Sequence, residues 1–138
     1  MNSSIKNILA VILGWVGGST INMALIQAGH AIYPIPNIDS NNMDALSEVM
    51  PTLGFNYFIF PFLAHAIGTL VGAFIAYSIA AANKMKFAYT IGILFLIGGI
   101  LVNFMITGPI WFTIADLLLA YIPMAWLGGT LAQKITKK

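Results

Sequence analysis

Four apolar stretches, each long enough to cross a bilayer, strongly restrict the folds that this chain can adopt. A helix that crosses ~30 Å of hydrocarbon at 1.5 Å per residue needs about 20 mostly apolar residues. Such stretches cover about residues 8–28, 55–82, 87–106 and 110–132. They are continuous apolar runs and lack the alternation of a membrane barrel strand, so they predict helices.

Charge is too scarce for a water-facing surface. Only 7% of the residues are charged and 59% are hydrophobic, whereas about a quarter of an average globular protein is charged. This excludes a soluble enzyme domain, a disordered tail and a nucleic-acid-binding module. The absence of cysteine excludes disulfides, a thiolate nucleophile and a Cys-ligated metal site. We expect an all-α membrane protein with one transmembrane domain over residues 1–138 and the lipid bilayer as its partner.

The charged residues that are present predict an orientation. The basic residues all lie at the ends or between the second and third stretches: Lys6, Lys84, Lys86, Lys134, Lys137 and Lys138. The long connection, residues 29–54, has no Lys or Arg and carries acids: Asp39, Asp44 and Glu48. Because positive charge concentrates on the cytoplasmic side, we predict an antiparallel four-helix bundle in the cell inner membrane. Both termini are then cytoplasmic, and the long loop is external.

The external loop is predicted to contain a short helix. Asn41 or Asn42 can cap it, it runs to about Met50, and Pro51 ends it. Apolar residues at helical spacing on one face suit a helix that rests on the outer membrane interface or on the mouth of the bundle. The loop is either a lid over helix ends or a surface that contacts a partner or substrate.

Small residues at a spacing of four mark predicted helix contacts, because small side chains let helices approach closely in lipid. The second stretch carries the longest series, and the first and fourth carry one pair each: Ala64, Gly68, Gly72, Ala76; Gly14, Gly18; Ala125, Gly129. This pattern fits packing within one chain, and a homodimer built on the second stretch is the alternative. A homo-oligomer is therefore expected.

A weak internal repeat joins the first and third stretches. Residues 17–22 and 98–103 both have the form GGxxxN. The two stretches run in the same direction, so a duplication would be a parallel one. Chance similarity in so biased a composition is the alternative.

Polar side chains inside the apolar stretches are the candidate site. Ionisable groups at membrane depth are expensive unless paired or hydrated, so each one is a site hypothesis. The candidates are His65, Asp116, Asn22, Asn103, Thr69 and His30. The predicted topology puts Asp116 about 9 Å and His65 about 15 Å below the outer ends of their helices. All four helices thus place a polar side chain in the outer half of the membrane.

A histidine and a carboxylate at this depth support several kinds of chemistry. They can pair structurally between helices, form a proton or solute site, or ligate a metal or haem. No HExxH, P-loop or GxSxG motif is present, so we assign no catalytic residue, metal or cofactor.

The leading hypothesis is a non-enzymatic, self-associating or partner-binding bundle whose polar cluster lies in its outer half. The alternative is a small-solute, ion or proton transporter or channel that uses His65 and Asp116 in an outward-open cavity. A third hypothesis is a membrane enzyme that uses these two residues as acid and base on a lipid-like substrate.

Several segments resemble a family of small bacterial four-span membrane proteins to which no activity is assigned. The resemblance is carried by residues 29–36 (GHAIYPIP), the Met43–Pro51 helix, residues 61–68 (PFLAHAIG) and residues 98–103. It covers most of the chain and is strongest from Gly29 to Ala76. It implies a bacterial inner-membrane protein, and it supplies neither a catalytic residue nor a substrate.

Overall fold

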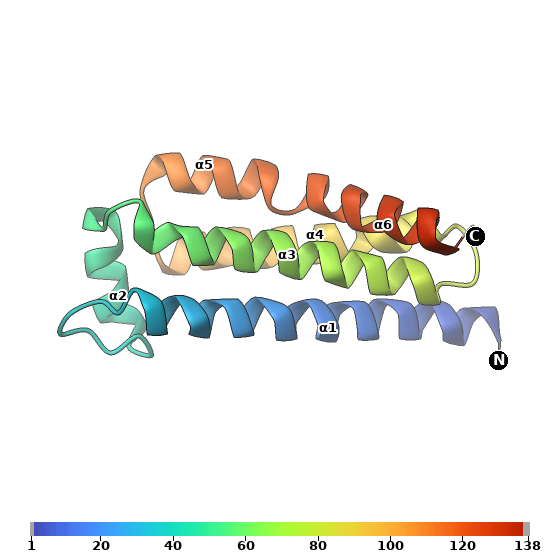
Figure 1. Ribbon diagram of the computed structural model, residues 1–138, viewed down its shortest axis with the longest axis horizontal. Helices are drawn as coiled ribbons and strands as arrows, with labels where there is room; N and C mark the ends of the chain where they lie inside the picture. Colours follow the sequence, from blue (N-terminus) through green and yellow to red (C-terminus); the bar gives the residue numbers. More distant parts are fainter. Residues whose placement is uncertain (1, 137–138) are drawn as a thin grey trace.

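The computed structural model describes residues 2–136, and these form helices joined by short connections, with no strand among them. The helices are α1 (Ser3–Ile32), α2 (Met43–Val49), the 3₁₀ turn η1 (Met50–Thr52), α3 (Asn56–Ile79), α4 (Lys84–Met105), α5 (Ile110–Leu119) and α6 (Ile122–Thr136). Long helices lie side by side along one axis, with both chain ends at one end of the bundle and α2 at the other (Figure 1). Four stretches are long and apolar enough to cross a membrane: α1, α3, α4, and α5 together with α6.

The outer surface of the bundle is apolar, as expected of a protein surrounded by lipid. Phe104 is 83% exposed, Ile110 78% and Ile8 60%. Among the described residues, the only buried polar or charged side chains are those of Thr69 and Asp116. This distribution supports a multi-pass membrane protein, because in water such a surface would favour aggregation.

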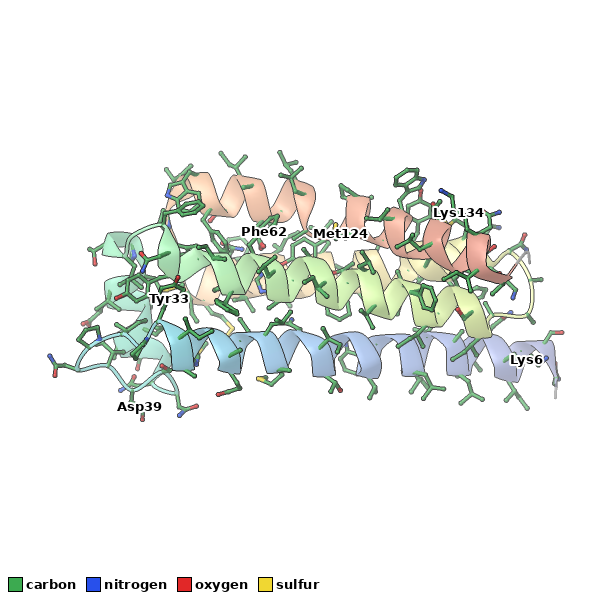
Figure 2. All side chains as sticks on the ribbon, in the orientation of Figure 1. Lys6, Tyr33, Asp39, Phe62, Met124 and Lys134 are labelled. Atoms are coloured by element: carbon green, nitrogen blue, oxygen red, sulfur yellow. The ribbon has the colours of Figure 1, made fainter. Side chains whose placement is uncertain are left out.

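Charge is separated along the bundle axis. Lys6 and Lys134 lie at the end that holds the chain termini, whereas Tyr33 and Asp39 lie at the opposite end (Figure 2). The end that carries Asp39 is called the acidic end below, and the other the basic end.

Helices α1 and α3 approach each other through glycines. A Cβ added to Gly18 would lie 2.6 Å from the Gly68 carbonyl oxygen, and one added to Gly14 would lie 2.7 Å from that of Gly72. The α3 small residues are therefore buried against α1 of the same chain, which supports the interpretation of the small-residue series as packing within one chain. A dimer built on that face would require α1 to leave it.

The fourth apolar stretch is not one continuous helix, contrary to the prediction for residues 110–132. Helix α5 ends at Leu119 and α6 begins at Ile122. The cause is Pro123, which has no N–H to donate and whose ring collides with the carbonyl four residues earlier. Across the break, the backbone hydrogen bonds outside the helices are those from Ala120 N to Asp116 O and from Ala125 N to Tyr121 O. The chain therefore bends at residues 120–121.

The connection between α1 and α3 forms the acidic end. Asn42 caps α2, with its side-chain oxygen accepting a hydrogen bond from Ala45 N at 3.1 Å, and Pro51 lies in the 3₁₀ turn that follows. Leu46 is the buried residue of α2, while Met43 is 41% exposed. One residue of the apolar face thus anchors α2.

Candidate functional site

His65 on α3 and Asp116 on α5 meet although 51 positions separate them in the sequence. The His65 Nδ1 lies 2.8 Å from Asp116 Oδ1 and 3.0 Å from Oδ2. An ionised carboxylate can only accept, so Nδ1 is the donor. His65 and Asp116, the two candidates considered for proton or acid–base chemistry, are therefore direct hydrogen-bond partners.

Tyr121 completes this contact and was missed in the sequence. Its hydroxyl donates to Asp116 Oδ2 at 2.9 Å, and its ring stacks on His65 with centroids 5.7 Å apart. In a continuous helix, residues five apart point about 140° away from each other. The break at residues 120–121 brings Tyr121 round to the carboxylate, and Pro123 was the signal from which this could have been inferred.

The network of His65, Asp116 and Tyr121 is nearly closed to the surroundings. Asp116 is 0% exposed and the His65 side chain 17%, and Tyr121 is buried. Burying a carboxylate is tolerable only when hydrogen-bond donors compensate it, and here both oxygens have donors. Neither His65 nor Asp116 lines the pocket between α3 and α5, the pocket between α4 and α5 or the open face of α1.

The second ring nitrogen of His65, Nε2, takes no part in the hydrogen-bond network. Nε2 has no hydrogen-bond partner among residues 2–136. In that part of the chain, the only buried side-chain nitrogen or oxygen without a partner is Thr69 Oγ1. Nε2 is therefore not sealed in the interior.

A second polar contact ties α5 to α4. The Thr113 hydroxyl donates to Asn103 Oδ1 at 2.9 Å, and Asn103 Nδ2 donates to the Gly99 carbonyl at the same distance. Asn103 was a predicted site residue, whereas Thr113 was not, because a threonine in an apolar helix usually bonds its own backbone. Helix α5 is thus hydrogen-bonded to both α3 and α4.

The remaining predicted residues do not join the network. Thr69 lies one turn further along α3, fully buried with an unpaired hydroxyl. Asn22 on α1 packs beside Gly68. A Cβ added to Gly68 would lie 3.0 Å from the Asn22 Cβ. His30 lies in the last turn of α1 and makes no side-chain hydrogen bond within residues 2–136. That part of the chain also contains no group of three or more His, Cys, Asp or Glu that could hold a metal ion.

Half-open pockets border α5 on two sides. One of about 280 Å³ lies between α3 and α5 and is lined mainly by aromatic rings, including those of Phe58, Phe62 and Trp111. The other, of about 310 Å³, lies between α4 and α5, and Asn103 and Thr113 are among the residues that line it. Both fall near the lower limit of volumes typical of ligand sites, about 300–1,000 Å³.

No family model, curated protein or solved structure matches the chain. Any functional conclusion therefore depends on the contacts described above.

Proposed function

We propose that this chain is a non-enzymatic, multi-pass protein of the bacterial inner membrane whose buried polar network fastens α5 to the rest of the bundle. The observation that carries this proposal is the environment of Asp116. Its carboxylate is fully buried, and its two oxygens accept hydrogen bonds from His65 on α3 and from Tyr121 at the break between α5 and α6. Removal of either partner of such a pair is strongly destabilising in proteins, so unfolding of the His65→Ala and Asp116→Ala variants tests the proposal. Wild-type stability in both would contradict it.

The charge separation supports an orientation with the basic end in the cytoplasm. Lys6 and Lys134 lie at the basic end, Asp39 at the acidic end (Figure 2), and basic residues favour the cytoplasmic side. A phosphatase reporter fused after Asp39 is expected to be active, and one fused after Asn83 inactive. Activity after Asn83 would contradict this orientation.

Self-association is proposed to use the outer face of α1. This helix packs mainly on α3, and its opposite side is an open surface lined by α1 residues alone, among them Ser19, Thr20 and Gln27. Polar side chains that face lipid favour contact with a second helix, which can satisfy their hydrogen bonds. The same face of a second copy would supply matching polar groups in a two-fold dimer.

A cysteine cross-link tests this dimer directly, because the chain contains no other cysteine. Ala24 lies on this open face of α1, and an Ala24→Cys variant is expected to form a disulfide dimer in membranes under oxidising conditions. An Ile93→Cys variant is the control, since Ile93 is a half-exposed residue on α4. Equal dimer yields from both positions would contradict an α1 interface.

Proton or small-solute transport is a second candidate function, favoured by the unpartnered Nε2 of His65. A histidine whose Nδ1 is held by a carboxylate and whose Nε2 is open can take up and release a proton. In liposomes with an internal pH dye, the wild-type protein is expected to dissipate a pH gradient faster than the His65→Gln variant. Equal rates for the two would argue against a proton path through His65.

A further inference from the structure

The two cavities beside α5 are separated by Asp116. Phe112, Ala115 and Leu119 of α5 line the α3 side, whereas Thr113 and Leu117 line the α4 side. At 100° per residue, position 116 falls between these two sets on the helix surface. A small outward movement of α5 would therefore join both cavities at the carboxylate.

Helix α5 has the features of a movable element. Its only buried residues are Phe112 and Asp116, and the break at residues 120–121 disconnects it from α6. Few buried contacts and missing backbone hydrogen bonds give a segment a low local stability. The side-chain hydrogen bonds that hold α5 to other elements are those of Asp116 with His65 and Tyr121 and of Thr113 with Asn103.

We propose that the two half-open pockets beside α5 are the halves of one binding site for a small protonated organic amine. The amine is bound when α5 swings outward about residues 120–121. Its ammonium group then donates to the Asp116 carboxylate in place of His65 Nδ1 and the Tyr121 hydroxyl. This inference rests on the proposed role of the network as the fastening of α5, and it adds a ligand to that role.

The chemistry of the walls favours a cation. Aromatic faces attract ammonium groups, and Phe58, Phe62 and Trp111 surround the α3 side. In the closed state Phe58 and Trp111 already contact each other edge to face, with centroids 5.4 Å apart. An apolar body would fill the aromatic cavity while the charged group reaches the carboxylate.

The charged and titratable groups around the site also favour a cationic ligand. The titratable side chains that face Asp116 are His65 from α3 and Tyr121 from the break between α5 and α6, and α4 contributes the uncharged Asn103 near Thr113. Lys6 and Lys134 lie at the basic end, and Asp39 lies at the end where α5 begins (Figures 1 and 2). Asp116 is therefore the acidic group at the site, and a carboxylate favours a cationic ligand.

Benzylamine is a suitable probe because it combines one aromatic ring with one ammonium group, and benzyl alcohol is its uncharged counterpart. Trp111 reports from the cavity wall if Trp15→Phe and Trp126→Phe remove the other tryptophans. In nanodiscs, benzylamine is expected to change Trp111 fluorescence saturably, with benzyl alcohol at least tenfold weaker. Asp116→Asn is expected to weaken benzylamine at least tenfold. Equal effects of the two probes, or unchanged binding in the variant, would overturn the proposal.

A second variant keeps the test decisive if Asp116→Asn does not fold. Phe58→Leu retains the His65–Asp116–Tyr121 network and an apolar wall but removes one aromatic face, so benzylamine should bind about fivefold more weakly. Unchanged benzylamine binding in this variant would overturn the aromatic recognition of the ammonium.

Movement of α5 is measured by spin labels on introduced cysteines. The Ile114–Ile97 distance joins exposed positions of α5 and α4, and the Leu131–Ile97 distance is the α6 control. Benzylamine is expected to lengthen the first and leave the second unchanged. If the network variants lose stability while benzylamine changes neither fluorescence nor distance, the structural role stands and the amine site is refuted.

Discussion

Replacing His65 with alanine is expected to lower the free energy of unfolding by about 3–5 kcal/mol, because it leaves a buried carboxylate without its main partner. Asp116 is fully buried and would retain the Tyr121 hydroxyl as its one side-chain donor. The carboxylate must then stay charged in a dry site or take up a proton, and both outcomes destabilise the native state at neutral pH. Denaturation in mixed micelles, followed by circular dichroism, measures this loss.

The size of the stability loss in His65→Ala distinguishes a buried charged pair from an ordinary hydrogen bond between membrane helices. Hydrogen bonds between membrane helices contribute about 0.6 kcal/mol on average and at most about 1.7 kcal/mol. Tyr121→Phe removes one donor to a carboxylate and should cost about 1.5 kcal/mol. Asp44→Asn is the control for loss of an acid, since Asp44 is exposed on α2 and should show near-wild-type stability. A His65→Ala loss within the range of single hydrogen bonds would mean that Asp116 is not held as a buried charge.

Gly18→Ala is expected to destabilise the bundle by about 2–3 kcal/mol through overpacking. The added Cβ would lie 2.6 Å from the Gly68 carbonyl oxygen and 3.2 Å from Gly72 Cα. Backbone atoms cannot rotate away as a flexible side chain can, so α1 must move off α3. Thermal unfolding in detergent gives the loss, and a cross-link between α1 and α3 cysteines reports the displacement.

Gly98→Ala is the matched control, because a Cβ at Gly98 meets no atom within 4 Å. Alanine also has the higher helix propensity, so this variant should match or exceed the wild type. If both glycine variants were equally stable, the close approach of α1 and α3 would not contribute to the fold.

Much of the architecture could be predicted from the sequence because the bilayer restricts it so strongly. Apolar length is enough to locate four candidate spans, and the structure contains four such stretches. The spacing of Gly14, Gly18, Gly68 and Gly72 predicted close helix contacts, and the structure pairs α1 with α3 there. Which helices would pair could not be predicted, because small-residue spacing shows a contact face without its partner.

The candidate site could be predicted only in part. His65 and Asp116 stood out as ionisable groups at membrane depth, but their contact depends on the angle between α3 and α5. Tyr121 and Thr113 resemble ordinary interfacial or helix-bonded residues until the break at residues 120–121 and the position of Asn103 are known. Pro123 signalled that break, since proline interrupts the helical hydrogen bonding that precedes it.

The central claim is that Asp116 is a buried charge held by His65, and a double-mutant cycle tests it most directly. Asp116→Ala in the wild-type background should lower the free energy of unfolding by about 2–3 kcal/mol, because two buried donors lose their acceptor. In the His65→Ala background, the same substitution should raise it, because it removes a stranded carboxylate. A further loss of stability in that background, additive with the first, would contradict the account.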